Sequence, residues 1–229
     1  MKVLVYGMPR TCTTVCCQML SQSLKIANLL EKFGEIRQHQ SRQAACDFLA
    51  TQDQCVAKIL TIDCIKENSF SYNPIDWSQA DRVVITSRKN YTNQICSDYF
   101  AREMGKHARF IQTQAELAEW RQLMKTTTIT VPMEHINRGN LLAHLQIFRD
   151  GCDHIRELCA NSVHEVTYED FQLPLTDLVA ELSKKLWFDL DPQIMDHINT
   201  YNMIRYNPDY TRQVLNYQEL DAVVQRALA

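Results

Sequence analysis

The sequence lacks an excess of one charge, a long apolar run, internal repeats and low-complexity tracts. Its 24 Lys and Arg residues face 27 Asp and Glu residues, so no global basic field exists to attract nucleic acid. Any site for an anion must therefore be local. No apolar run approaches the roughly 20 residues that a membrane-spanning helix needs, so we expect neither a nucleic-acid nor a membrane partner.

Cysteine patterns that bind metals are also missing, although the chain has nine cysteines. There is no Cys-x-x-Cys pair and no His pair at zinc-finger spacing, and most cysteines lie in apolar periodic segments, where a thiol behaves as a small hydrophobic group. The odd number, and an N-terminus that resembles a core strand rather than a signal peptide, predict a reduced, cytoplasmic protein without a metal. With 229 residues and 45% hydrophobic content, we expect one domain spanning residues 1–229.

The most informative pattern lies at the N-terminus. An apolar run over residues 3–6 ends at Gly7 and Pro9, and a Thr-rich entry leads into an apolar-periodic segment at residues 15–24. This pattern predicts a buried strand, a tight loop and a helix. Such a loop directs backbone N–H groups and the positive end of the helix dipole at one point, which suits an anion.

The lysine of a nucleotide-triphosphate P-loop is missing from this loop. Counted from Gly7 on the frame of Gly, four free positions, Gly, Lys and Ser or Thr, the chain has Cys12, Thr13 and Thr14. A triphosphate site uses that Lys on the β- and γ-phosphates, so the pattern weakens an ATPase or kinase interpretation. Arg10 supplies a planar fork of donors instead, and the two threonines supply hydroxyls in the first helical turn.

A strand followed by Pro-Arg and by Thr-x-Thr-Thr opening a helix resembles the 5′-phosphosulfate loop of the sulfotransferases, usually Pro-(Lys or Arg)-Ser-Gly-Thr-Thr. The matching residues are Pro9, Arg10, Thr11, Cys12, Thr13 and Thr14. The chain departs at Cys12, where the family has Gly, and a positive φ at this position would disfavour Cys. The resemblance implies that the loop binds 3′-phosphoadenosine 5′-phosphosulfate (PAPS) and that Arg10 stabilises charge on the departing phosphate.

A second stretch follows the strand predicted at residues 83–86. Arg88 and Lys89 come directly after that strand, and Ser97 lies in the next predicted helix. Because open α/β sheets bind ligands at the carboxyl ends of their strands, a cation and a hydroxyl there can meet on one phosphate. The stretch resembles the sulfotransferase 3′-phosphate motif, with Tyr91 replacing its Pro. The resemblance assigns Ser97 and either Arg88 or Lys89 to that phosphate.

The resemblance also implies a catalytic base after the first helix. The run Gly-Glu-Ile-Arg around Glu35 is similar to the tyrosyl-protein sulfotransferases and makes Glu35 the base, in a segment where we expect exposed backbone near an end of an element. Cytosolic members carry a Lys and a catalytic His at the end of the strand that corresponds to residues 55–60. This chain has Lys58 but not the His, so His39 and Asp63 are the alternatives to Glu35.

The rest of the chain is less specific. Its patterns predict a helix at residues 41–51, a largely helical block at 104–159, a strand beginning at residue 163, a helix at 173–190 and two helices beyond residue 192. The run Tyr-Glu-Asp at residues 168–170 resembles an architectural motif of the family, which caps a helix. The family's C-terminal Arg-Lys-Gly triplet is missing, which leaves Arg205 and Arg212 as candidates for closing the nucleotide site.

These patterns together predict an α/β fold, a three-layer sandwich with a central parallel sheet of the P-loop-like type and a helical insertion. The resemblance implies a sulfotransferase, similar to bacterial or viral soluble members, that transfers a sulfuryl group from PAPS to a hydroxyl or amine. The acceptor would be a small molecule, a glycan or a peptide. The alternatives are a degenerate P-loop-like protein that binds a phosphorylated ligand without catalysis, and a small nucleotide-dependent kinase.

Overall fold

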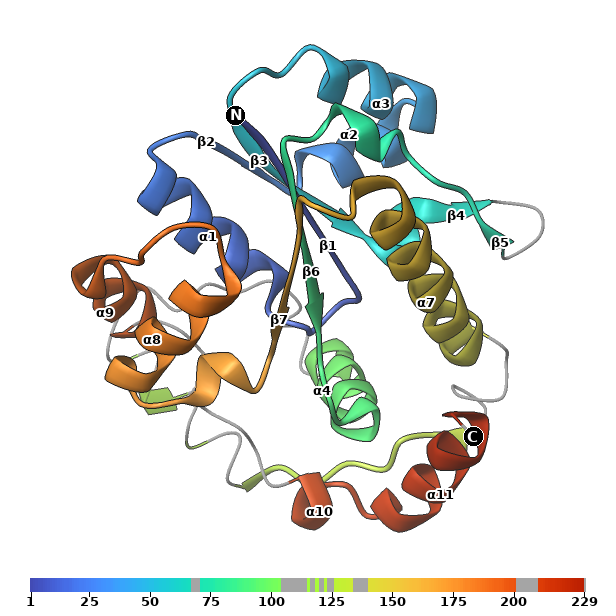
Figure 1. Cartoon of the computed structure of the whole chain (residues 1–229). Helices are drawn as coiled ribbons and strands as arrows, with labels where there is room; N and C mark the ends of the chain where they lie inside the picture. The colour runs from blue at the N-terminus through green and yellow to red at the C-terminus, as the bar shows by residue number, and fades with distance from the viewer. Residues whose placement is uncertain are drawn as a thin grey trace.

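A computed structural model describes residues 1–66, 71–103, 126–133, 140–200 and 210–228, together with residues 115, 118, 119 and 122. Its centre is a five-stranded parallel sheet in the order β2-β3-β1-β6-β7 (Figure 1). The strands are β1 (Lys2–Gly7), β2 (Ala27–Leu30), β3 (Cys55–Leu60), β6 (Arg82–Ser87) and β7 (Val163–Thr167). A separate two-stranded antiparallel sheet joins β4 (Ile65–Lys66) to β5 (Ser71–Tyr72).

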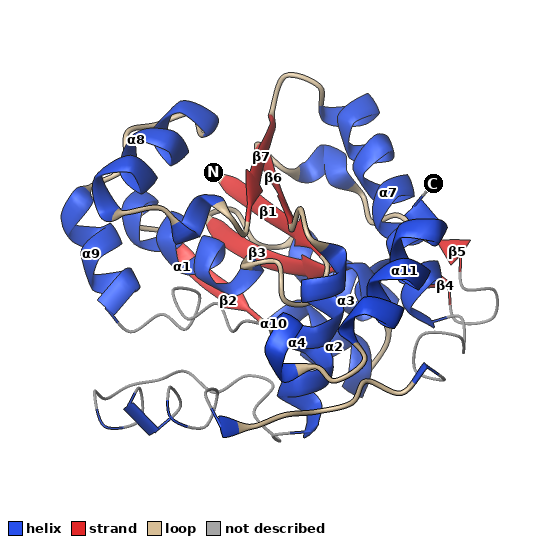
Figure 2. Ribbon diagram, turned by 90° about the horizontal axis from the view of Figure 1, so that it is seen from below, coloured by secondary structure: helices blue, strands red, loops and turns tan. Residues whose placement is uncertain are grey.

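Helices cover both faces of the sheet, as the sequence predicts for a three-layer sandwich. Side chains of β1 alternate: Val3 and Val5 face one hydrophobic cluster, whereas Leu4 and Tyr6 face the other. The first cluster is closed by α1 (Thr13–Leu24), α8 (Leu175–Lys185) and α9 (Pro192–Thr200). The second is closed by α2 (Lys32–His39), α3 (Arg42–Ala50) and α7 (Asn140–Cys159), and Figure 2 shows the two helical layers on either side of the strands.

A third group of helices lies beyond the carboxyl ends of the strands (Figure 1). It consists of α4 (Tyr91–Glu103), α10 (Tyr210–Gln213) and α11 (Tyr217–Leu228). A small hydrophobic cluster joins them, with Ile95 and Cys96 from α4 packing near Val214, Leu220 and Val224. Short 3₁₀ turns at Thr61–Cys64, Trp77–Gln79 and Asp170–Gln172 complete the connections.

Most predicted elements are confirmed, and three positions need correction. Gly34, expected in exposed backbone near an end of an element, lies inside α2 and is half-buried, because Phe33 and Ile36 anchor that helix in the core. The helix expected at residues 173–190 ends at Lys185. The edge strand β2 has no counterpart in the prediction. Much of the predicted helical block, and Arg205, lie outside the described residues.

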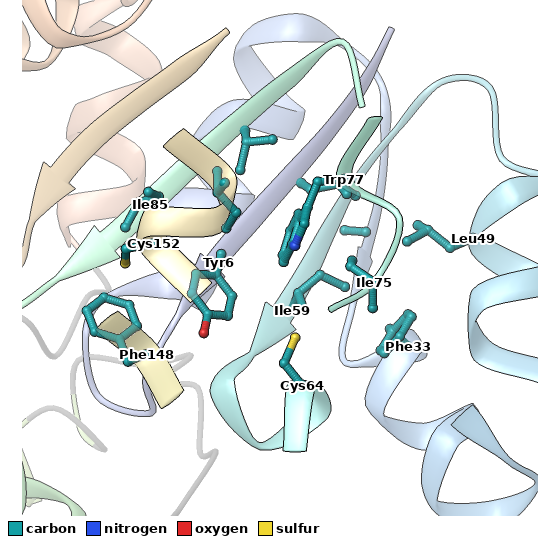
Figure 3. Packing of buried hydrophobic residues seen from close by; sticks show 14 of the residues in the cluster. Tyr6, Phe33, Leu49, Ile59, Cys64, Ile75, Trp77, Ile85, Phe148 and Cys152 are labelled. Carbon is teal, nitrogen blue, oxygen red and sulfur yellow. The ribbon is translucent and has the colours of Figure 1, made fainter. Parts of the chain in front are cut away.

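Helix α7 packs closely against the sheet at Tyr6. Its ring stacks on Phe148 with centroids 5.5 Å apart, and meets Trp77 edge-on at 5.3 Å (Figure 3). Burial raises the pKa of Tyr6 far above its usual value, so its hydroxyl stays protonated, donating to the Ile147 carbonyl oxygen at 3.4 Å. Gly151 of α7 lies directly over this hydroxyl: a Cβ there would be 2.3 Å from the Tyr6 oxygen.

We expect Gly151→Ala to destabilise the protein by about 1–3 kcal/mol, because the added methyl group overpacks the core against Tyr6. At an exposed helical site the same change stabilises by up to about 1 kcal/mol, so the sign is diagnostic. Urea denaturation measures the difference. In a Tyr6→Phe background the cost should shrink, since the nearest clashing atom is the hydroxyl; a neutral or stabilising Gly151→Ala would contradict this packing.

Candidate functional site

The loop after β1 is closed around Gly7. A Cβ on this residue would lie 2.1 Å from Thr86 Oγ1, 2.7 Å from Thr13 Cγ2 and 2.8 Å from Thr11 Oγ1, so no side chain fits there. The Thr11 hydroxyl donates to the Met8 carbonyl oxygen at 2.7 Å and lies 3.1 Å from the Thr86 hydroxyl. These contacts hold the loop against β6 and the start of α1.

Two of the loop's residues have a left-handed backbone. Arg10 has φ of 68° and Cys12 has φ of 65° and ψ of 11°. Each such non-glycine residue costs roughly 1–2 kcal/mol, and strain of this kind gathers at functional sites. Cys12 aligns with the Gly of the sulfotransferase loop that the chain resembles, and here it has positive φ and a buried thiol.

The first turn of α1 offers its N–H groups without side-chain competition. Cys12 is the N-cap and its side chain makes no capping hydrogen bond, and the first turn contains no acidic residue. Helix N-termini carry unsatisfied N–H donors and the positive end of the helix dipole. This end of α1, with Thr13 buried and Thr14 partly exposed, is therefore electrostatically suited to an anion.

Helix α4 ties the loop to the second predicted stretch. Gln94, which is buried, donates its amide to the Pro9 carbonyl oxygen at 2.9 Å. Arg10 Nε donates to Ser97 Oγ at 3.1 Å, although the two residues are 87 positions apart in sequence. The structure thus brings together the two stretches that sequence reasoning assigned to phosphate groups.

The two candidate cations after β6 have different surroundings. Arg88 is only 2% exposed, and its guanidinium carbon lies 4.0 Å from the centroid of the Tyr168 ring, a cation–π contact. Lys89 is exposed, and its backbone N–H donates to both carboxylate oxygens of Glu169 at 3.1 Å. Arg88, unlike Lys89, therefore lies inside the protein, near α4 and Cys12. Its positive charge opposes the rise in the pKa of the Cys12 thiol that burial causes.

Lys58 approaches the same helix end from β3. Its ammonium group donates to Thr14 Oγ1 at 3.0 Å and forms an ion pair with Glu31, and its side chain is buried. Burial raises the pKa of the neighbouring Cys17 thiol to about 12, against the opposing effect of Lys58. Sequence reasoning noted Lys58 but missed Glu31, whose only signal is an acidic residue directly after an apolar run.

The predicted bases occupy other positions. Glu35 lies in α2 with its side chain 57% exposed, 3.5 Å from Lys32. His39 is the last residue of α2 and is exposed. Asp63 is buried and accepts from the Leu60 N–H at 2.8 Å and from Arg37 Nε at 2.9 Å; burial raises its pKa, against these hydrogen bonds and the Arg37 charge. Asp63 therefore fastens α2 to the end of β3.

The remaining predicted features are placed as follows. Asp170 is buried, pairs with Lys185 at 2.7 Å and accepts from the Thr167 N–H, so it ties the end of β7 to α8. The predicted helix cap is wrong, because neither the N-cap of α8, Pro174, nor Glu169 makes a side-chain capping bond. Arg212 lies in α10 and is exposed. All nine thiols are free. Within the described segments, no cluster of His, Cys, Asp and Glu could hold a metal ion, and no helix is long and apolar enough to cross a bilayer.

The strain at Cys12 can be measured by two substitutions. Cys12→Gly and Cys12→Ala both delete the thiol, but only Gly relaxes a left-handed backbone, so we expect the Gly variant to be more stable by about 1 kcal/mol. Thermal or urea unfolding gives the difference. The matched control is Cys16 inside α1, where Gly should be less stable than Ala by about 1 kcal/mol. If Gly were also less stable than Ala at position 12, the backbone of Cys12 would not be left-handed in solution.

A comparison with models of known protein families finds no match, and a comparison with curated proteins finds none either. The function of this site therefore has to be inferred from its residues and their geometry.

Proposed function

We propose that this protein is a PAPS-dependent sulfotransferase. The observation that carries the proposal is the 3.1 Å contact between Arg10 Nε and Ser97 Oγ, which unites the loop after β1 with the helix after β6. Each of these stretches resembles one of the two phosphate-binding motifs of that family. Their meeting at the carboxyl ends of adjacent parallel strands is where open α/β sheets bind ligands.

The residues present fit the two phosphate groups of the donor. The uncapped first turn of α1, Arg10 and the Thr14 hydroxyl would hold the 5′-phosphosulfate, and Ser97 with Arg88 would hold the 3′-phosphate. Guanidinium groups have only donors, which complements the acceptor oxygens of both groups. The donor itself supplies the sulfuryl group and leaves as adenosine 3′,5′-bisphosphate. The P-loop-like character of the sheet belongs to the same proposal.

The chain's cations prepare the site for negative charge that develops as the leaving phosphate departs. Arg10 donates to Ser97 and has a fixed left-handed backbone, so its guanidinium group needs little reorganisation as the charge develops. Lys58 is held beside the first turn of α1 by Thr14. Fixed donors of this kind act more strongly in a partly buried site than in water.

Glu31 is better placed than Glu35 to take the acceptor's proton. Its side chain is half exposed and forms an ion pair with Lys58, whose ammonium group also donates to Thr14. Glu35, the base predicted from sequence, contacts Lys32 on the outer side of α2 instead. A general base must come within hydrogen-bond reach of the proton it removes, so we infer that Glu31 rather than Glu35 has this role.

Several further properties follow from the proposal. The acceptor carries a hydroxyl or amine on a small molecule, glycan or peptide, and the protein needs neither nucleic acid, membrane nor metal. Nine free thiols support a reducing, cytoplasmic location. A binding protein without catalysis and a small kinase are the rival functions; the kinase is disfavoured by Thr13, which is buried where a P-loop has its lysine.

Ligand-dependent unfolding distinguishes these functions. A ligand that binds only the folded state raises the melting temperature, so adenosine 3′,5′-bisphosphate should stabilise the protein more than magnesium-ATP. Ser97→Ala should reduce the shift caused by the bisphosphate and leave the shift caused by 5′-AMP nearly unchanged, because only the former has a 3′-phosphate. A larger shift with magnesium-ATP would favour the kinase, and equal losses for both nucleotides would make Ser97 structural.

The base is tested by a pair of isosteric substitutions assayed with PAPS and a panel of phenolic, sugar and amine acceptors. Glu31→Gln keeps a hydrogen bond to Lys58 but removes basicity, so we expect turnover to fall by about two orders of magnitude or more. Affinity for adenosine 3′,5′-bisphosphate should be preserved. Glu35→Gln is the control and should retain turnover; the reverse result would restore Glu35 as the base.

A further inference from the structure

The C-terminal helices reach the candidate anion site through one buried side chain, Tyr210. This residue opens α10 and is 4% exposed. It packs against α4 beside Ile95 and Cys96, the residue directly before Ser97. Burial raises the pKa of Tyr210 to about 12, against the opposing effects of Ser97, Arg88 and Arg10. Tyr210 therefore lies next to the part of α4 whose Ser97 accepts from Arg10.

The position of Tyr210 is set by well-formed contacts around it. The Ile129 N–H donates to the Gln213 carbonyl oxygen at 2.8 Å, and the side chain of Asn216 binds both the N–H and the carbonyl of Val131. Thr92 of α4 donates to Asp221 of α11 at 2.6 Å. Helices α10 and α11 are thereby fastened to α4, which lies next to the loop after β1 (Figure 1).

The cluster that results is rich in hydrogen-bond donors. Arg10 and Arg88 contribute guanidinium groups, which cannot accept, and Ser97 and Tyr210 contribute hydroxyls that can rotate to donate. Ser97 Oγ already accepts from Arg10 Nε. A phosphate or sulfate group has several acceptor oxygens and no donor when fully ionised, so it complements this cluster.

We propose that Tyr210 is a ligand of the phosphate group bound by Arg88 and Ser97, next to Arg10, and that anion binding tightens the docking of α10 and α11 onto α4. This inference rests on the proposed donor site and adds a C-terminal residue to it. Tyr210 then takes the place of the basic triplet that the chain lacks, without contributing a charge. Arg205 and Arg212, the residues suggested from sequence, are not needed for this closure.

The test compares two variants that each remove one hydroxyl joining the C-terminal helices to α4. Tyr210→Phe keeps the ring in its hydrophobic cluster. Tyr217→Phe is the matched control, since its hydroxyl donates to Asn93 Oδ1 at 2.8 Å rather than to Ser97. Calorimetry gives the Kd of adenosine 3′,5′-bisphosphate and of pyrophosphate, and hydrogen exchange reports on α10 and α11 with and without each ligand.

We expect Tyr210→Phe to raise both Kd values about tenfold or more, as for loss of a hydrogen bond to a charged group, and to abolish the ligand-induced protection of α10 and α11. Tyr217→Phe should leave the Kd values nearly unchanged. Equal weakening in both variants, no weakening in Tyr210→Phe, or no binding of either ligand would overturn the inference. Tyr210-dependent binding of pyrophosphate alone would support it and contradict the proposed donor.

Discussion

The site depends on the lack of a side chain at Gly7. Three threonines from the loop, α1 and β6 fill the space where a Cβ would project, with Thr86 Oγ1 only 2.1 Å from that position. Because β1 pairs with β3 on one side and β6 on the other, this contact fixes the loop relative to the middle of the sheet. The geometry of this loop is therefore a property of the core and not of an independent surface loop.

A loop held this closely can retain a strained backbone. Arg10 and Cys12 have positive φ values, and the loop is fastened where Gln94 binds the Pro9 carbonyl and Ser97 binds Arg10. Both of those partners come from α4, so the strand-to-helix unit after β6 supports the unit after β1. Strained residues persist where the surroundings over-determine them, which keeps the backbone N–H groups of the loop in one arrangement before any ligand arrives.

Sequence reasoning succeeded where the signal was local. The run at residues 3–6 of β1 is continuous and apolar, and β3 is apolar apart from Lys58, as expected for parallel strands buried on both faces. The meeting of Arg10 with Ser97 follows from the shared carboxyl edge of such strands. It failed at β2, whose four residues lie at the edge and are incompletely buried. Gly34 also misled, because the burial of Phe33 and Ile36 outweighs a glycine's low helix propensity. Glu31 has only a weak sequence signal, since its place beside Lys58 depends on the non-local pairing of β2 with β3.

That pairing explains how a carboxylate can lie beside a helix end that is electrostatically suited to an anion. Two like charges about 4 Å apart repel by about 4 kcal/mol at the effective dielectric near a protein surface, which is enough to expel a bound phosphate. Here the Lys58 ammonium contacts both Glu31 and Thr14, so a cation lies between the carboxylate and the helix end. Burial of Lys58 limits screening by water and strengthens this separation. Glu31, which follows the edge strand β2 and caps α2, thus lies beside the site without cancelling the positive field of α1, because the buried lysine of β3 stands between them.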